Sequence, residues 1–302
     1  MKAIITGASG FVGGYLRDHL EQSGDDAFGL DRDDGLDVTD RAGVARIFTG
    51  LQPEVVYHLA ALSHVGESWE APKQVIETNV VGTLNVLDAA RAAGARRVLV
   101  IGSAEEYGLL QGAPHPLTED EPLRPRTPYG ASNVGAGFLA LQAFLGTGLE
   151  TIRVRAFNHT GPGQPPRFVV PALAHRIAQT EHEGGDAIAV GNLDPVREVN
   201  DVRDVVRAYR LLVEHGVAGD VYNVCSGVGV AVREVATRLL EKAIRPLELR
   251  VDPAFARPAD VPFLVGDPSK LIAATGWKPE HTLDDTLTDM LASARAAVEA
   301  QE

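Results

Sequence analysis

Residues 1–14 of the chain, MKAIITGASGFVGG, decide its fold. The apolar residues 3–5 predict a short buried strand, and three glycines follow at regular spacing: Gly7, Gly10 and Gly13. Apolar side chains then recur at helical spacing from Phe11 and Val12 onward, so a helix begins inside the glycine turn. Glycines let the backbone approach a pyrophosphate, and the helix N-terminus offers unpaired N–H groups and the positive end of a dipole. The stretch therefore predicts a dinucleotide site; the alternative is a tight turn that holds no ligand.

Two neighbouring residues bear on the choice of dinucleotide. Asp31 ends a second predicted strand at 27–31, and a carboxylate there accepts hydrogen bonds from the adenosine ribose, which favours NAD. Arg32 follows at once; it either meets a 2′-phosphate, which favours NADP, or is a solvated loop charge. The sequence leaves NAD and NADP open. Asp37 and Val38 lie where a further segment would flank the adenine, the alternative for Asp37 being the N-cap of the next helix.

Strands and helices alternate through the first half of the chain. Further strands are predicted at 54–58 and 97–101, with a long helical pattern at 72–94 between them. This alternation predicts an α/β fold with a doubly wound parallel sheet of the Rossmann type, in which ligands bind beyond the carboxyl ends of the strands. Asn79 lies among apolar residues of the helical pattern, so we expect its amide to bond a backbone carbonyl or a water. The loop after strand 54–58, where small side chains let a cofactor lie across the sheet edge, begins Leu59, Ala60, Ala61.

The composition limits the classes of protein to which the chain can belong. The chain has 302 residues, 45% of them hydrophobic, and its formal net charge of −13 argues against holding nucleic acid or an anionic membrane by bulk charge. The one cysteine, Cys225, has apolar neighbours and is expected to be a buried, inert thiol. No apolar run reaches the length of a membrane span and no signal-peptide pattern opens the chain, so we expect a soluble cytoplasmic protein. No metal site is predicted.

Two hydroxyl groups lie close to the carboxyl end of the predicted sheet. Ser103 follows strand 97–101, and Tyr129 begins a helical pattern at 129–145. A serine after one strand and a tyrosine on the next helix can converge on one carbonyl oxygen. The serine polarises this oxygen, and the tyrosine gives or takes a proton while hydride moves at the adjacent carbon.

With these features the chain resembles the extended short-chain dehydrogenase/reductases. The matching features are the glycine turn, Asn79, Ser103 and Tyr129. Within that family the chain is most similar to the GDP-sugar branch, which holds GDP-mannose 4,6-dehydratases and GDP-4-keto-6-deoxy-mannose reductases. The stretches that carry this similarity, over nearly the whole chain, are 60–69, 102–108, 157–164, 191–194, 200–209 and 221–227.

The resemblance implies roles for further residues. Phe157 and His159 line the nicotinamide end of a cofactor that is NADP or NAD. The side chains expected at the sugar nucleotide are Ser63, His64, Ser103, Glu105, Glu106, Asn158, Val170, Arg197 and Arg257. The two arginines are expected to clamp the diphosphate, because a guanidinium binds phosphate bidentately; the alternative is a surface ion pair. A structural role is an equal alternative for His64.

The resemblance also divides the chain. Residues 1–160, with returning segments near 200–225, form a dinucleotide-binding Rossmann domain, and residues 161–302 form mainly a smaller C-terminal α/β cap that binds the sugar nucleotide. A helix at 201–215 returns to the first domain. The other elements expected after residue 160 are a helix at 168–179, a strand at 186–190 and a closing helix at 283–298. The helices at 75–93 and 129–145 are expected to pair across a homodimer.

One position departs from the family pattern Tyr-x-x-x-Lys, because Asn133 stands where the lysine belongs. By resemblance, the lysine holds the nicotinamide ribose and lowers the pKa of the tyrosine. Asparagine keeps a hydrogen bond but carries no charge, so we expect Tyr129 to stay protonated and to act better as an acid than as a base.

Three functions are compatible with these residues. The first is an NADP(H)- or NAD(H)-dependent reductase of a 4-keto-6-deoxy sugar nucleotide, with Tyr129 as proton donor. The second is a 4,6-dehydratase or epimerase that recycles its cofactor, with Glu105 as the base or, alternatively, only as a substrate contact. The third is a binding protein without competent catalysis, because of Asn133. The lost lysine and the short chain favour the reductase.

Overall fold

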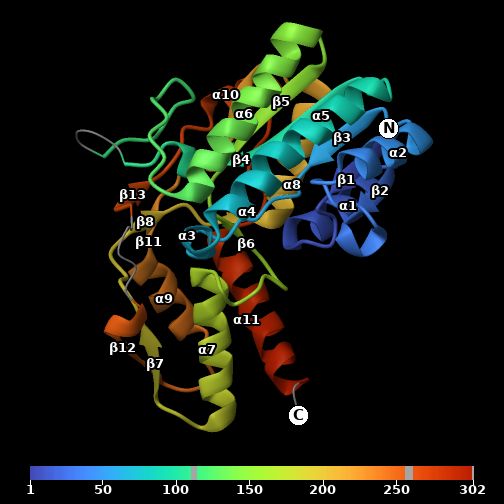
Figure 1. Ribbon diagram of the computed structural model, residues 1–302. Coiled ribbons are helices and arrows are strands. Elements are labelled where there is room, and N and C mark those ends of the chain that lie inside the picture. The colour runs from blue at the N-terminus through green and yellow to red at the C-terminus, as the bar shows by residue number, and fades with distance from the viewer. Residues whose placement is uncertain (110–113, 256–260, 301–302) are drawn as a thin grey trace.

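A six-stranded parallel sheet forms the centre of the computed structural model, which describes residues 1–109, 114–255 and 261–300 (Figure 1). Its strands run in the order β10-β5-β4-β3-β1-β2. Their bounds are β1 (Lys2–Thr6), β2 (Asp26–Leu30), β3 (Val55–His58), β4 (Arg97–Ser103), β5 (Glu150–Ala156) and β10 (Val221–Val224). Every neighbouring pair is parallel, so the predicted doubly wound sheet is confirmed.

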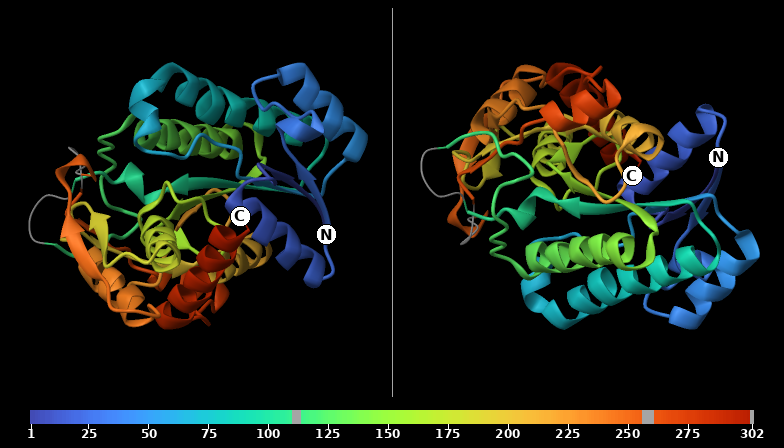
Figure 2. Two further views of the ribbon diagram at one scale, coloured as in Figure 1. Left: turned by 90° about the horizontal axis from the view of Figure 1, so that it is seen from below. Right: turned by 90° about the horizontal axis from the view of Figure 1, so that it is seen from above.

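Helices cover both faces of this sheet, as Figure 2 shows. One face packs against α1 (Phe11–Gln22), α8 (Val202–His215) and α10 (Ser269–Thr275). The other face packs against α2 (Arg41–Leu51), α5 (Gly82–Ala92) and α6 (Pro128–Thr147). In β1, Ile4 points to one of these cores and Ile5 to the other, and both are fully buried. A strand buried on both faces explains the continuous apolar run at the start of the chain.

The long helical pattern at 72–94 is a helix with a widened turn. It comprises α4 (Pro72–Ile76), the π-helical turn η2 (Glu77–Val81) and α5. The buried Asn79 lies in this turn, and its carbonyl accepts a hydrogen bond from the Thr83 hydroxyl at 2.6 Å. Such π turns within helices are frequent at functional sites.

The C-terminal part encloses a hydrophobic core of its own. Its helices are α7 (Val169–Glu183), α9 (Val232–Glu241) and α11 (Leu283–Glu299), which contribute the buried side chains of Ile177, Leu239 and Leu287. Its small sheets join β7 (Ala187–Val190) to β12 (Glu248–Val251), and β8 (Val196–Arg197) to β11 (Val230–Ala231) and β13 (Phe263–Leu264). A further pair joins β6 (His159–Thr160) to β9 (Asn200–Asp201). The remaining short helices are η1 (Arg32–Asp34), α3 (Glu67–Glu70), η3 (Ala104–Glu106) and η4 (Pro253–Phe255).

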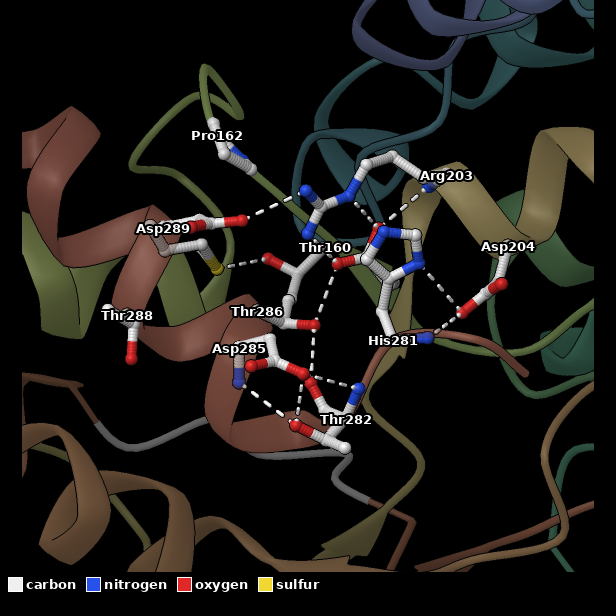
Figure 3. A network of polar contacts seen from close by, with 12 residues as sticks. Thr160, Pro162, Arg203, Asp204, His281, Thr282, Asp285, Thr286, Thr288 and Asp289 are labelled. Atoms are coloured by element: carbon white, nitrogen blue, oxygen red, sulfur yellow. Dashed lines mark hydrogen bonds and ion pairs between the residues drawn. The ribbon is translucent and has the colours of Figure 1, made fainter.

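Buried carboxylates at the start of α8 fix the closing helix α11 to the main sheet. Asp201 accepts hydrogen bonds from Arg203 and from the Thr286 hydroxyl of α11. Arg203 also pairs with Asp289 of α11 at 2.9 Å (Figure 3). Asp204 accepts the backbone N–H groups of Glu280 and His281, just before α11. Because α8 packs on the sheet, these contacts set how α11 lies against it. Within the residues that the structure describes, none of the helices has both the length and the hydrophobicity of a membrane span.

Candidate functional site

The glycine turn between β1 and α1 has the shape that a diphosphate requires. Gly7 has a φ of +75°, and a Cβ there would lie 2.8 Å from the Ala60 nitrogen in the loop after β3. A Cβ on Gly13 would lie 2.3 Å from the Gly7 carbonyl oxygen, so the helix begins tight against the turn. No side chain of the described residues caps α1, which leaves the N–H groups of its first turn, at Phe11 and Val12 among others, to a ligand. The turn therefore fits a dinucleotide phosphate.

Asp31 is fixed against this turn. The Ser9 hydroxyl donates to its Oδ2 at 2.7 Å, and the Arg32 backbone N–H donates to its Oδ1 at 2.7 Å. Arg32 itself is exposed. The Asp31 carboxylate thus lies against the turn near which the resemblance puts the adenosine ribose, and the roles of Asp31 and Arg32 stay predictions.

The segment after Asp31 corrects one alternative from the sequence. Helix α2 is capped by Asp40, which accepts the Ala42 N–H, and not by Asp37. Asp37 accepts hydrogen bonds from the backbone and hydroxyl of Thr39 in a local turn. Val38 is buried beneath α5, so its side chain contributes to the core at this edge.

Asn79 organises the loop after β3. Its Oδ1 accepts the Leu62 N–H at 2.8 Å, and its Nδ2 donates to the Leu62 carbonyl at 3.2 Å and to the Ser132 hydroxyl at 2.9 Å. The expected bond to a backbone carbonyl is confirmed. One buried amide therefore ties the loop that carries Ala60 and Ala61 to helix α6.

Ser103 and Tyr129 meet at the carboxyl edge of the sheet. Ser103 ends β4, and Tyr129 lies in the first turn of α6, which Thr127 caps through the Gly130 N–H. Burial raises the pKa of Tyr129 to about 12, against hydrogen bonds with Ser103 and Asn133 that lower it. The carboxylates of Glu105 and Glu106 raise this pKa further. Tyr129 is therefore protonated at neutral pH and is an acid that can donate.

The neighbours of this pair set its hydrogen-bond directions. The Ser103 hydroxyl oxygen accepts the Glu105 N–H at 3.2 Å, which leaves its own proton to donate. Asn133 is buried, and its Nδ2 donates to the Tyr129 carbonyl at 2.9 Å. The amide thus lies against its own helix beside the phenol, without charge.

The loop after β5 brings the next predicted residues to the same edge. Phe157 is buried and Asn158 exposed, and His159 Nδ1 lies 2.9 Å from the Phe157 carbonyl. Burial lowers the pKa of His159, so the ring is neutral and donates from Nδ1. The loop is held to α1 by the Tyr15 hydroxyl, which donates to the Pro162 carbonyl at 2.9 Å.

The predicted substrate residues divide into several groups. His64 packs edge-on against Phe168, just before α7, with ring centroids 5.8 Å apart, and Ser63 beside it is exposed. Val170 is buried in the C-terminal core, and Arg197 lies on β8. Arg257 lies outside the described residues. Glu105 stays beside Tyr129, whereas Glu106 turns inward and is buried, which differs from the expected substrate contact.

Sequence reasoning missed Arg155, the buried partner of Glu106. Its Nε donates to the Glu106 carboxylate at 3.1 Å. The available signal was the alternation in β5, where Arg153 and Arg155 share one face of a strand whose other face is apolar. An arginine at a buried strand position requires a partner, which the sequence could not identify.

Comparisons with known proteins show which sequences and folds this chain is similar to. A sequence model of the family described as GDP-mannose 4,6 dehydratase matches residues 34–290. A Pseudomonas aeruginosa protein described as GDP-6-deoxy-D-mannose reductase is 35% identical over 299 residues, 98% of this chain and 98% of that protein. A solved structure of RMD from Pseudomonas aeruginosa, complexed with NADPH, superimposes with a TM-score of 0.91 at 34% identity, covering 98% of this chain and 100% of that one. A UDP-glucose 4-epimerase from Thermus thermophilus in complex with NAD gives a TM-score of 0.88 at 28% identity, with coverage of 98% and 100%.

Proposed function

Because this chain belongs to the GDP-mannose 4,6-dehydratase family, we propose that it is an NAD(P)H-dependent reductase of a 4-keto-6-deoxy sugar nucleotide, with the GDP-linked compound as the first substrate to test. The observation that supports this most is the hydrogen-bonded pair of Ser103 and a protonated Tyr129. The similarity to a GDP-6-deoxy-D-mannose reductase over nearly both chains supports the same reaction. The glycine turn and Asp31 are the proposed cofactor site.

The proposed reaction adds a hydride and a proton to a ketone and leaves an alcohol. When bound, the reduced nicotinamide supplies the hydride. Ser103 donates a hydrogen bond to the ketone oxygen, and Tyr129 donates the proton to the same oxygen as negative charge develops there. Asn133 holds the phenol by a neutral hydrogen bond. Arg197 on β8 is the proposed contact to the diphosphate among the described residues.

A direct assay tests this proposal. The purified protein is mixed with GDP-4-keto-6-deoxy-mannose and NADPH or NADH, and the loss of nicotinamide absorbance is followed together with the sugar product. Turnover that consumes one cofactor for each ketone supports the reductase. Binding of both compounds without turnover would instead identify a binding protein.

A 4,6-dehydratase is the second candidate, because Glu105 lies beside Tyr129 and the matching family model bears that name. In that reaction Tyr129 first removes a proton from the C4 hydroxyl, and Glu105 removes one at C5. The raised pKa of Tyr129 means that this oxidation starts from the minor, basic form of the phenol, whereas reduction starts from the form present at neutral pH. Conversion of GDP-mannose without added cofactor would establish the dehydratase in place of the reductase.

The choice of cofactor gives a first prediction. Replacing Asp31 with asparagine removes a negative charge beside Ser9, so the ratio of kcat/KM for NADPH to that for NADH should rise by about tenfold, which corresponds to about 1.4 kcal/mol. Arg32→Ala should lower the same ratio, because it removes the cation available to a 2′-phosphate. Asp33→Asn is the matched control, as an exposed carboxylate of the same short helix. If all three variants kept the wild-type ratio of kcat/KM for NADPH to that for NADH, neither Asp31 nor Arg32 would select the cofactor.

We further propose a homodimer through the helices α4, α5 and α6. Apolar side chains are exposed on these helices and on the turn η2 between them: Ile76, Val81, Leu84, Phe138 and Leu145. Phe138→Glu should convert the dimer to monomer in sedimentation velocity, with the dimer Kd raised at least about a hundredfold by a buried charge. Ile244→Glu is the control, because that side chain is 76% exposed on the C-terminal part. A wild-type monomer at micromolar concentration would contradict the dimer.

The separate hydrophobic cores support a division of roles between two parts of the chain. We propose that residues 1–160 with the returning segments near 200–225 bind the cofactor and that residues 161–302 mainly bind the sugar nucleotide. The proposed location is the cytoplasm, since the single cysteine, Cys225, is free and buried and requires no oxidising compartment.

A further inference from the structure

A buried ion pair lies directly behind Ser103. The side chains of Glu106 and Arg155 are each 6% exposed, and the Arg155 Nε lies 3.1 Å from Glu106 Oε2. The other carboxylate oxygen, Oε1, accepts the Ser103 backbone N–H at 3.2 Å. Glu106 therefore joins the residue that carries the reactive hydroxyl to the neighbouring strand β5.

The hydrogen bonds around Ser103 are reciprocal. Ser103 caps the short helix η3 by accepting the Glu105 N–H, and Glu106 at the end of that helix bonds back to the Ser103 N–H. This capping box fixes both the backbone and the hydroxyl of Ser103. The hydroxyl oxygen accepts the Glu105 N–H, and its single proton stays available to donate, to Tyr129 in this structure and to the ketone in the proposed complex.

The chain makes room for this carboxylate. A Cβ on Gly102 would lie 2.2 Å from Glu106 Oε1, so any other residue there would displace the acceptor from the Ser103 N–H. Gly102 belongs to β4 and pairs with Arg155 of β5, and the Val154 carbonyl oxygen is 2.8 Å from the same Cβ position. The absence of a side chain at Gly102 thus lets Glu106 lie under the strand.

Arg155 is itself held rigidly. Its Nη1 donates to the Tyr107 hydroxyl and to the Glu119 carbonyl, each at 2.9 Å, and its guanidinium lies 4.8 Å from the Tyr107 ring centroid. The Tyr107 hydroxyl in turn donates to Asn223 of β10 at 2.6 Å. Three strands therefore brace the carboxylate that bonds Ser103: β4, β5 and β10.

From these contacts we infer that Glu106 is a positioning residue, which holds Ser103 in place for the carbonyl through its backbone N–H and is anchored by Arg155. This role differs from the substrate contact that the sequence predicted for Glu106. It deepens the proposed reductase function and rests on it for its kinetic consequence. Misplacement of a reacting group by about 1 Å can cost about a hundredfold in rate, so the bond carries a measurable effect.

The test compares two double variants that differ only in the acceptor for the Ser103 N–H. Glu106→Gln with Arg155→Met keeps an amide oxygen at this place, and Glu106→Leu with Arg155→Met removes it. Both remove the buried charges together, so neither leaves an ion unpaired. Relative to the glutamine variant, the leucine variant should lose about tenfold to a hundredfold in kcat, with KM for the sugar nucleotide changed less than about threefold. Equal kcat values in the two variants would overturn the inference.

Two further measurements keep the test decisive. Hydrogen exchange at residues 101–108 should be faster in the leucine variant than in the glutamine variant, whether or not the protein reduces the proposed substrate. Equal exchange would refute the positioning role, whereas absent turnover with this difference intact would refute only the proposed reaction. If the leucine variant does not fold, Glu106→Asp is tested instead, because its shorter side chain keeps the charge but moves the carboxylate away from the Ser103 N–H. Unchanged kcat and unchanged hydrogen exchange in this variant would also refute the positioning role of Glu106. The control is Glu181→Leu with Arg295→Met, an ion pair between α7 and α11 that should change neither readout.

Discussion

Replacing Tyr129 with phenylalanine is expected to lower kcat for the ketone reduction by about a thousandfold, within the range for loss of a general acid. The variant removes one oxygen, which both contacts Ser103 and carries the proton proposed to reach the ketone. The ring remains, so the first turn of α6 keeps its Thr127 cap and Pro128. Binding of the cofactor, measured by fluorescence titration, should weaken by less than about tenfold, because one neutral hydrogen bond contributes about 1 kcal/mol.

Tyr57→Phe is the matched control for this variant. Tyr57 lies on β3 and is fully buried, and its hydroxyl has no hydrogen-bond partner among the described residues. The same atom is removed from the same domain, but away from the reacting groups, so kcat should change by less than about twofold. If Tyr129→Phe kept the wild-type kcat, Tyr129 would not be the proton donor and the assignment of this edge as the active site would fail.

The fold was predictable where its signals are local. The strand, glycine turn and helix at residues 1–14 form a contiguous pattern, and the parallel sheet follows from the alternation of strands and helices. The sequence offers Asp37 as an alternative cap for α2, whereas Asp40 holds it, because two aspartates three residues apart give the same local signal. Strands of two residues, such as β8 and β13, are too short to show a period.

The contacts within the candidate site could not be predicted from the sequence. Asn79 was expected to bond a backbone carbonyl or a water, and its partner Leu62 lies 17 positions away, with nothing in either stretch that marks the pair. The resemblance implied that Glu106 faces the sugar nucleotide, and carboxylates are usually exposed. Its inward turn depends on the missing side chain at Gly102 and on Arg155 of a different strand. Such pairings arise only when the strands come together.

Replacing Asn133 with lysine is expected to restore a positive charge beside the Tyr129 phenol. A nearby cation favours the phenolate, so the pKa of Tyr129 should fall from about 12 by roughly 1–3 units. The residue has space to lengthen, because Asn133 lines a small cavity together with Gly137, Arg153 and Glu106. On the basic side of the pH–rate profile, the pH at which the rate changes should decrease by the same amount.

The rate effect of this substitution should be the same in both directions. A lower pKa makes Tyr129 a stronger acid for reduction and makes its basic form more abundant for oxidation of the alcohol. An enzyme does not change the overall equilibrium constant of its reaction. The substitution must therefore change kcat/KM for the reduction and for the reverse oxidation by the same factor. If about half of the free energy that corresponds to the pKa change appears in the activation barrier, the common factor is about threefold to thirtyfold.

Asn133→Met separates charge from length in this experiment. Methionine reaches into the same cavity without a cation, so it should leave the basic limb of the pH profile where it is in the wild type. An Asn133→Lys variant with an unchanged pH–rate profile would show that the lysine ammonium does not reach the phenol. Pairing of this ammonium with the nearby Glu106 carboxylate would explain that result.

Turnover that appears only with lysine at position 133 would mean that the wild-type chain binds its ligands without catalysing their reaction. Clear wild-type turnover with the expected acceleration would instead mean that a neutral amide suffices for reduction, since the protonated phenol that starts the reaction is already the resting form.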